Sequence, residues 1–348
     1  MYRYSINSKT IAKIHNFSVS APNMNKKTKN NKKLAVVALG GNAILRGDQV
    51  GTIEEQEENT SKTIANLLFL IRDGYDLIIT HGNGPQVGHL LLKNEAGNQL
   101  YNLPPMPLDI CVAESQGDIG YMIERMLRNI LTKNKLEKDI LTIVTQVVVN
   151  KNDPALKNPT KRIGQAYPKK IAEKLSREKG WVFKPSPKEK GSYRRVVASP
   201  MPIEIFNRES IGKAAKSGAI VIASGGGGIP VYRDGKGMLR PVEAVIDKDF
   251  ASALLASRLQ ADELYILTDV PNVFLNFGKP DQKAVEFLNY CDTEKYLKEG
   301  QFGEGNMLPK IKAALEFIKM GGSKSVITEA TKLEDRSYGT KITLEYED

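Results

Sequence analysis

Short apolar runs that end in glycine or polar turns recur along this 348-residue chain. Several runs are rich in β-branched residues and lack polar–apolar alternation, a pattern typical of strands that are buried on both faces. Helix-length segments separate the runs, and strands that alternate with helices indicate a mainly parallel sheet covered by helices on both sides. The predicted strands are residues 34–39, 75–80, 140–149, 219–223, 264–267 and 324–328, and the predicted helices include residues 60–73, 117–134 and 249–259. The sequence therefore predicts an α/β fold, a three-layer αβα sandwich around a mainly parallel central sheet.

One segment interrupts this alternation of strands and helices. Residues 151–202 hold seven of the 17 prolines, together with many lysines and arginines. Proline at this density does not occur in a central sheet, and so long a connection within a compact domain is usually functional. We interpret the segment, called the insert below, as a small subdomain that protrudes from the main sheet as a lid, with Tyr167, Trp181 and Tyr193 as its core. A surface loop without regular structure is the alternative.

The positive charge of the chain is concentrated before the first predicted strand. Residues 1–33 carry eight of the ten excess positive charges and contain no Asp or Glu. The predicted domain, residues 34–348, is therefore nearly neutral, which argues against a nucleic-acid-binding protein. For the basic, low-complexity extension three interpretations stay open: a disordered tail, translation that starts at Met24, and an organelle transit peptide. We expect a cytoplasmic protein, or one in a mitochondrion-like organelle if the extension is a transit peptide.

Simple features argue against several other classes of protein. No stretch approaches the roughly 18 consecutive apolar residues of a membrane span, so we expect no membrane partner. Cys111 and Cys291 lie far apart and match no metal-binding or redox spacing, which predicts buried intracellular thiols without a disulfide framework. The sequence contains neither a P-loop motif nor the G-x-G-x-x-G dinucleotide motif, which argues against a P-loop enzyme and a nicotinamide oxidoreductase.

Three glycine clusters follow predicted strands, at residues 40–43 (GGNA), 82–85 (GNGP) and 224–228 (SGGGG). In open α/β sheets, ligands bind beyond the carboxyl ends of the strands. Glycine lets the backbone approach a ligand closely, and a helix that begins just beyond offers free N–H groups to a phosphate. Three such turns in one sheet therefore predict an anion-binding site at this edge. His81 and His89 flank the second cluster, and we expect them to shape the site rather than to act as bases.

Lysines and aspartates near these turns indicate which chemistry the anion site supports. Asp247, Lys248 and Asp249 open a predicted helix. Lys310 lies at the start of another predicted helix, and Lys161 lies in the insert. Phosphoryl transfer requires cations around the transferring oxygens, and one lysine–phosphate contact at about 4 Å contributes on the order of 4 kcal/mol before desolvation, at an effective dielectric of about 20. The alternatives are solvated surface lysines and, for the three residues at 247–249, a helix N-cap with an ion pair.

Taken together, these motifs resemble the amino acid kinase superfamily and, within it, the carbamate kinases. The resemblance runs from about Leu34 to the C-terminus. The matching segments are ALGGNA at 38–43, THGNGPQVG at 80–88, SQGDIGY at 115–121, NPTK at 158–161, GGGIP at 226–230, AVIDKD at 244–249 and NFGKPD at 276–281. So many matching segments make the resemblance highly specific.

The resemblance implies reversible phosphoryl transfer, carbamoyl phosphate + ADP = ATP + carbamate, by direct in-line transfer and in the ATP-forming direction of arginine breakdown. The implied catalytic residues are Lys161, Lys248, Asp249 and Lys310. The implied substrate-binding residues are Gly40, Gly41, Asn42, Gly82, Asn83 and Gly84. The implied nucleotide-binding residues are Gly226, Gly227, Gly228, Asp247, Lys248, Thr268, Asp269 and Lys310. The resemblance also implies Mg²⁺ held mainly by the nucleotide phosphates, without a dedicated protein metal site, and a homodimer.

One position separates the chain from the other members of the superfamily. Acetylglutamate, aspartate and uridylate kinases resemble one another in placing a lysine two residues before the first glycine turn, where this chain has Ala38. Carbamate kinases likewise lack that lysine, and the resemblance implies that Lys161 of the insert supplies its charge. Another amino acid kinase activity and a non-catalytic sensor are the alternatives. Arg162 and Ala198 stand where the family usually has proline, which bears on the rigidity of the insert.

Overall fold

The computed structural model describes residues 32–46, 49–186, 189–303, 307–335 and 337–346. Residues Lys32–Asp348 form one compact unit. The predictions for the N-terminal extension, residues 1–33, concern residues that lie outside the described part, apart from the last two. None of the described helices combines the length and the apolar character that crossing a membrane requires. Cys111 is buried as predicted, but the prediction was wrong for Cys291, which is exposed.

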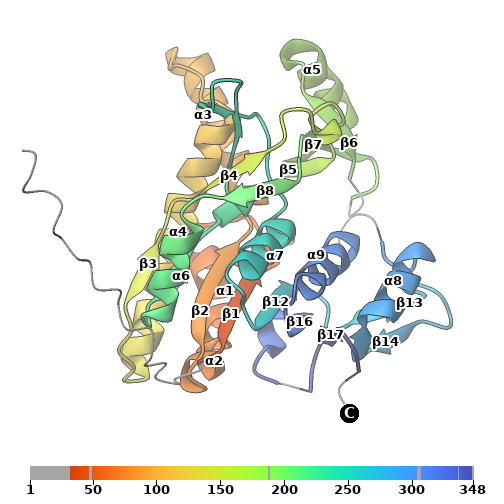
Figure 1. Ribbon diagram of the computed structural model, residues 1–348. Helices are drawn as coiled ribbons and strands as arrows, with labels where there is room; N and C mark the ends of the chain where they lie inside the picture. The colour runs from red at the N-terminus through yellow and green to blue at the C-terminus, as the bar shows by residue number, and fades with distance from the viewer. Residues whose placement is uncertain (1–31, 47–48, 187–188, 304–306, 336, 347–348) are drawn as a thin grey trace, which may run out of the picture. The chain divides into compact units, whose positions relative to one another are not determined.

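The central sheet has eight strands within the described residues, and it is mainly parallel (Figure 1). Their order is β15 (Phe287–Asn289), β17 (Thr340–Thr343), β16 (Lys324–Glu329), β12 (Glu263–Thr268), β1 (Leu34–Leu39), β2 (Asp76–His81), β9 (Ile220–Ile222) and β3 (Ile140–Thr142). Only the β16–β17 pair is antiparallel. The predicted α/β class with a mainly parallel sheet is confirmed.

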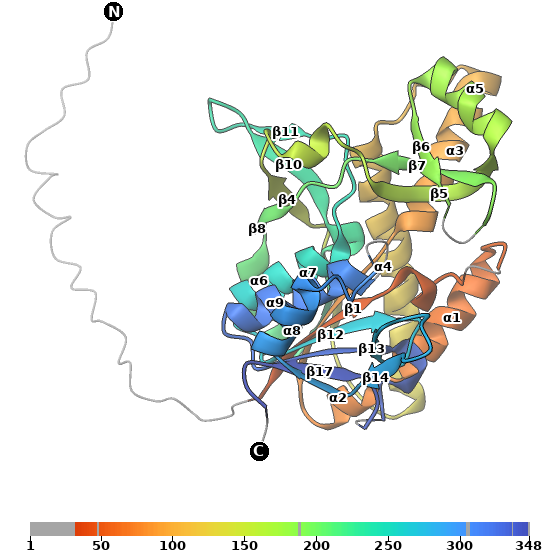
Figure 2. The same ribbon diagram turned by 90° about the vertical axis from the view of Figure 1, so that its right-hand side faces the viewer.

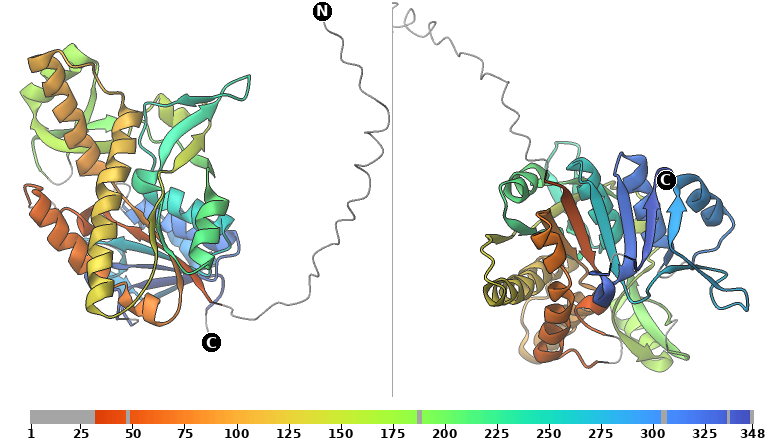
Figure 3. Two further views of the ribbon diagram at one scale, coloured as in Figure 1. Left: turned by 90° about the vertical axis from the view of Figure 1, so that its left-hand side faces the viewer. Right: turned by 90° about the horizontal axis from the view of Figure 1, so that it is seen from below.

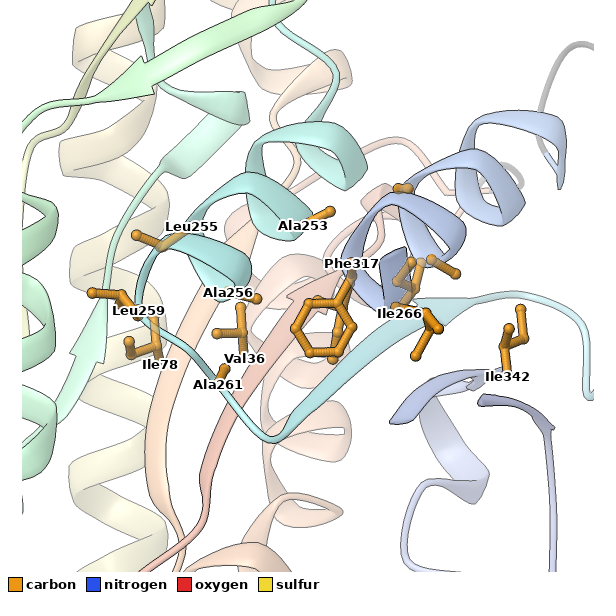
Figure 4. Packing of buried hydrophobic residues seen from close by; sticks show 14 of the residues in the cluster. Val36, Ile78, Ala253, Leu255, Ala256, Leu259, Ala261, Ile266, Phe317 and Ile342 are labelled. Carbon is orange, nitrogen blue, oxygen red and sulfur yellow. The ribbon is translucent and has the colours of Figure 1, made fainter. Parts of the chain in front are cut away.

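Helices cover both faces of this sheet, as Figure 3 shows. One face carries α6 (Arg208–Lys216), α7 (Lys248–Arg258), α8 (Tyr290–Lys298) and α9 (Met307–Lys319), and the other carries α1 (Ile53–Ala65), α2 (Leu68–Arg72) and α4 (Leu108–Lys133). Side chains of the strands alternate between the two faces. Val36 and Ile78 pack in the apolar core beneath α6 to α9, and Val37 and Ile79 pack in the apolar core beneath α1, α2 and α4. Phe317 of α9 is fully buried over the sheet (Figure 4). Such burial stabilises the fold by about 1.5–3 kcal/mol for each large apolar side chain.

Three predicted elements were wrong in their extent. The strand predicted at 140–149 is two strands in different sheets, since β4 (Gln146–Val149) belongs to a second sheet. The break falls at Thr145, whose backbone N–H donates to Gln116 of α4 instead of to a neighbouring strand. The helix predicted at 60–73 is the pair α1 and α2, and that predicted at 117–134 begins nine residues earlier, as α4.

Smaller sheets flank the central one. The second sheet has the order β11 (Leu239–Pro241), β10 (Ile229–Arg233), β4 and β8 (Pro202–Ile205). A two-stranded sheet consists of β13 (Val273–Leu275) and β14 (Lys283–Val285). The insert contributes an antiparallel sheet of β5 (Lys161–Pro168), β7 (Ser192–Val197) and β6 (Val182–Pro185), with α5 (Lys169–Lys179) between β5 and β6.

Aromatic side chains pack together within the insert. Tyr167 and Trp181 both lie against Phe183, with ring centroids 5.7 Å and 6.5 Å apart. The guanidinium of Arg195 lies 3.9 Å from the centroid of the Trp181 ring, a cation–π contact. Tyr193 pairs with Tyr167 across the β5–β7 ladder. The described part of the insert therefore has regular structure and its own aromatic cluster.

Helix α3 (Gly84–Tyr101) lies along the insert (Figure 2). A Cβ atom at Gly88 would lie only 2.0 Å from the Cα of Gly164 in β5, so the two backbones are in direct contact. Lys179 of α5 forms an ion pair with Glu95 of α3. These contacts fix the insert to a helix that itself begins at the second glycine cluster.

We expect Gly88→Ala to lower the free energy of unfolding by about 1–3 kcal/mol, because overpacking forces the backbones of α3 and β5 apart. Urea denaturation would measure the change. Gly117→Ala is the matched control: Gly117 is exposed on α4 and no atom lies within 4 Å of its Cβ position, so this change should stabilise by up to about 1 kcal/mol. Equal effects of the two substitutions would contradict the role of the contact.

Candidate active site

The first glycine cluster lies at a large cavity beyond the ends of the central strands. The cavity has a volume of about 1180 Å³, and its wall includes residues from the ends of β1 and β12, the start of α7 and the insert. The predicted site residues on the wall are Gly40, Gly41, Lys161, Asp247, Lys248, Thr268, Asp269 and Lys310. The carboxyl edge of the sheet therefore forms a pocket, as the position of the glycine clusters predicts.

Two aspartates gather the three predicted lysines into one cluster. Asp249 is buried, and its carboxylate pairs with the Nζ of Lys248 and, at 2.9 Å, with the Nζ of Lys310. Asp247 accepts a hydrogen bond of 2.6 Å from the Nζ of Lys161, which reaches it from the insert. Lys310 and Lys161 thus bring their charges to the start of α7, although they lie 61 and 86 positions from Asp249 and Asp247 in the sequence.

The start of α7 also explains how this cluster is held. Asp247 is the N-cap of α7, and its Oδ1 accepts from the backbone N–H of Asp249 at 2.9 Å. The local interpretation of residues 247–249, a helix N-cap with an ion pair, is therefore correct, and it coexists with the lysine cluster. The cap orients one aspartate toward Lys161 while the helix turn directs the other toward Lys248 and Lys310.

Burial and charge shift the pKa values in this cluster in different directions. Burial acts to raise the pKa of Asp249, but Lys248 and Lys310 outweigh it and hold the pKa well below the usual range. Burial acts to lower the pKa of Lys310, and the charge and hydrogen bond of Asp249 more than reverse this effect. For Lys248 burial dominates, so its pKa lies below the ordinary value. Of the two lysines on Asp249, Lys248 therefore loses its proton first as the pH rises.

The first two glycine clusters lie beside Lys248. Gly41 is the first residue of a short 3₁₀ helix, Gly41–Ala43, which contains Asn42. A Cβ atom placed on Gly41 would have no atom within 4 Å. A Cβ at Gly82 would lie 3.5 Å from the Cδ of Lys248 and 3.6 Å from the N of Gly41. The two turns and the lysine are thus immediate neighbours. Gly84, at the start of α3, lies next to the insert. A Cβ atom placed on Gly84 would lie 4.0 Å from the carbonyl oxygen of Arg162.

The third glycine cluster packs against the second one. Gly226 has φ +63°, and a Cβ there would lie 2.1 Å from the Nδ2 of Asn83, a position only glycine fills. That Nδ2 donates to the Oγ of Ser115 at 2.9 Å, and Gln116 donates to the carbonyl oxygen of Gly225 at 2.9 Å. Like Gly82, Asn83 and Gly84, the glycines of the third cluster (Gly226, Gly227 and Gly228) are not among the described residues that line the cavity. Their position supports a role in holding Asn83.

His81 lies beneath the same turns. Burial lowers the pKa of His81 to about 4, and its Nδ1 lies 3.0 Å from the carbonyl oxygen of Gly82. The imidazole is therefore neutral near pH 7, and its Nε2 faces Gly225, whose Cβ position lies 2.4 Å away. The geometry fits the expectation that this histidine shapes the site. Burial also lowers the pKa of His89.

Sequence reasoning missed two groups of cavity residues. Four phenylalanines, Phe250, Phe274, Phe277 and Phe302, line the cavity and are called the aromatic wall below, and the ring centroids of Phe274 and Phe277 lie 6.1 Å apart. Aromatic side chains of this kind can pack against a purine ring, and no sequence signal marked them, because they come from three separate segments. The second group is basic and comes from the insert: Arg162, Lys184 and Arg194 also line the cavity. Alternation along β7 would have revealed Arg194, had that strand been predicted.

Comparisons of the sequence and of the structure with known proteins indicate the same family. Residues 33–329 match the amino acid kinase family. The chain is 46% identical to the carbamate kinase of Pyrococcus horikoshii over 312 residues, which cover 88% of this chain and 98% of that protein. It is 47% identical to the carbamate kinase of Clostridium perfringens, with the same coverage. The structure of carbamate kinase from Giardia lamblia bound to AMP-PNP is similar with a TM-score of 0.81 at 36% identity, over 90% of this chain and 98% of that one.

The family match covers most of the chain, and the relatives align over nearly their full length. The cavity adds a cluster of cations beside glycine turns, as phosphoryl transfer requires. The chain therefore belongs to the amino acid kinase family, in which it is a phosphotransferase of the carbamate kinase group.

Proposed function

We propose that the protein transfers a phosphoryl group between carbamoyl phosphate and ADP, with ATP and carbamate as the products. The observation that carries this proposal is the lysine cluster: Asp247 and Asp249 gather Lys161, Lys248 and Lys310 at one cavity. Charge spread over the transferring oxygens is stabilised by cations already in place, which cost no reorganisation during the reaction. The transfer is in-line and direct, without a phosphoenzyme.

The residues of the cluster divide the work between the two substrates. Lys310 and Lys248 contact the nucleotide phosphates, and Asp249 orients both ammonium groups. Lys161 neutralises the transferring phosphoryl from the insert, in place of the lysine that other superfamily members have at the position of Ala38, which is fully buried in β1 here. Gly40, Gly41, Asn42 and the turn at 82–84 surround carbamoyl phosphate. The aromatic wall, with Thr268 and Asp269, binds the nucleotide.

Magnesium fits this site as an ion held mainly by phosphates. The carboxylates on the cavity wall are those of Asp247 and Asp269, and within the described residues no group of three or more His, Cys, Asp or Glu side chains lies close enough to hold a metal. Mg²⁺ commonly uses one or two carboxylates together with substrate phosphates. When bound, it would supply additional positive charge at the phosphate oxygens. Asp269 and Asp247 are the residues that would hold it.

We also propose the ATP-forming direction, as the last step of arginine breakdown, and a homodimer. The direction is supported by the chemistry of the product, because carbamate decomposes to ammonia and carbon dioxide and is thereby removed. The dimer is supported by a group of exposed apolar side chains at α3 and α4. They are Leu100, Tyr101, Leu103, Met106, Ile110 and Tyr121. Exposed apolar groups of this kind commonly mark interaction surfaces.

A coupled assay of ATP formation tests the reaction directly. The purified chain should form ATP from carbamoyl phosphate and ADP in the presence of Mg²⁺, and should not phosphorylate N-acetylglutamate at a comparable rate. Absence of ATP formation, with ADP binding intact, would instead support a non-catalytic sensor. Phosphorylation of N-acetylglutamate would support the other superfamily activity.

We expect Lys161→Ala to lower kcat by about 10²-fold or more with a smaller change in the KM values, because the charge acts on the transition state. Steady-state kinetics with each substrate varied would measure this. Lys170→Ala provides the control, since Lys170 is an exposed lysine of the same insert. An unchanged kcat for Lys161→Ala would show that the insert lysine takes no part in the transfer.

The pH dependence of activity should reflect Lys248. Its pKa lies below the ordinary lysine value because of burial, and the protonated form is the one that binds phosphate. Activity should therefore fall as the pH rises through this lowered pKa, giving an alkaline limb of kcat/KM below the ordinary pKa of lysine. In Lys248→Arg, whose guanidinium stays charged, the limb should disappear even if the absolute rate drops. The same limb in both proteins would assign it to another group.

A further inference from the structure

The insert sheet presents one basic face to the cavity. Arg194 pairs with Lys184 on β6, and Arg162 pairs with Val196, two residues further along β7. Because alternate residues of a strand share a face, Arg162, Lys184 and Arg194 lie on the same side of the sheet. All three line the cavity. The neighbouring Arg195 lies on the other face, where its guanidinium stacks on Trp181.

The two arginines of this face have donors without acceptors. Within the described part of the chain, the buried Nε atoms of Arg162 and Arg194 have no hydrogen-bond partner, and no carboxylate lies within 4.0 Å of either guanidinium. The Nη2 of Arg162 reaches only the carbonyl oxygen of Pro185, at 3.4 Å. A buried donor that lacks a partner costs free energy, and more so when it carries a charge.

The arginines also differ from the lysine cluster in their electrostatics. Each of the three lysines is paired with an aspartate, whereas burial lowers the pKa of the Arg194 guanidinium and the charge of Arg162 lowers it further, against an opposing effect of Glu189. Two like charges therefore stand side by side at the cavity wall. An anion bound by the Nη groups of both guanidiniums would remove the repulsion.

We propose that Arg162 and Arg194 form a second oxyanion subsite, on the insert, that binds the phosphate of carbamoyl phosphate. This subsite rests on the proposed function. The forked N–H groups of arginine match the oxygens of a phosphate and can bind them in pairs.

The position of Arg162 favours the acyl phosphate over the nucleotide as the ligand. Its carbonyl oxygen lies against Gly84, beside the second glycine turn, and its neighbour Lys161 pairs with Asp247. The aromatic wall that fits a purine comes from other elements, around β13 and the starts of α7 and α9. The oxyanion closest to the insert is therefore that of carbamoyl phosphate.

Steady-state kinetics of the full chain tests the subsite. Arg162→Gln and Arg194→Gln should each raise the KM for carbamoyl phosphate by about 10- to 100-fold, as expected for losing a charged hydrogen bond, and change the KM for ADP by less than about twofold. Arg162→Lys, which keeps the charge but loses the fork, should give an intermediate KM. Arg177→Gln is the matched control, because Arg177 is exposed on α5 of the same insert. Its KM values should equal those of the unchanged protein.

Calorimetry with inorganic phosphate, in the absence of nucleotide, separates this proposal from the reaction itself. Both glutamine variants should bind phosphate at least about tenfold more weakly than the unchanged protein and Arg177→Gln. An increase of the KM for ADP alone would overturn the assignment to carbamoyl phosphate, and unchanged KM and phosphate affinity would overturn the subsite. If the unchanged protein turns over no carbamoyl phosphate, the proposed function fails, and calorimetry still decides: weakened phosphate binding supports the subsite and equal binding overturns it.

Discussion

The buried carboxylate of Asp249 is the interaction on which the rest of the site depends. It pairs with two lysines at once, Lys248 from its own helix and Lys310 from α9. Two ammonium groups placed together without this carboxylate would repel each other and would lose their hydration without compensation. With it, the two cations are held in fixed positions while each keeps donors that can face the cavity. The same ion pairs therefore join α7 to α9 and fix the positive charges of the site.

The glycine clusters are the second requirement, and their roles differ. Gly41 and Gly82 leave space beside Lys248, where a ligand can approach the backbone. Gly226 leaves space for a side chain of the protein itself, Asn83. All three clusters have the same appearance in the sequence, since each is a glycine-rich turn after a strand. Only the structure distinguishes a glycine that exposes a backbone from one that accepts a neighbouring side chain.

Sequence reasoning succeeded where the cause was local. The strand at 34–39 was predicted with its observed bounds, because a continuous apolar run ends at Gly40. The convergence of the three lysines was implied by the resemblance to the carbamate kinases, since Lys161 lies in the insert and not at the end of a predicted strand or helix. The division of residues 140–149 was missed because it depends on Gln116, which takes the backbone hydrogen bonds of Thr145 from a distant part of the chain. The aromatic wall was missed for the same reason, since segments far apart in the sequence build it.

The third lysine of the cluster comes from the insert and not from the central sheet. A lysine on β1 would be fixed in the central sheet, but Ala38 of this chain is buried there without charge, and Lys161 comes from the insert. The contact of Gly88 with Gly164 and the Lys179–Glu95 ion pair fix the insert to α3, which begins at the second glycine turn. The position of Lys161 therefore depends on packing some distance from the aspartate with which it pairs. Because Arg162 follows Lys161 directly in β5, any shift of that strand would move the third lysine and Arg162 together. In the proposed subsite, binding of the anion would therefore be coupled to completion of the cation cluster through one short segment of backbone.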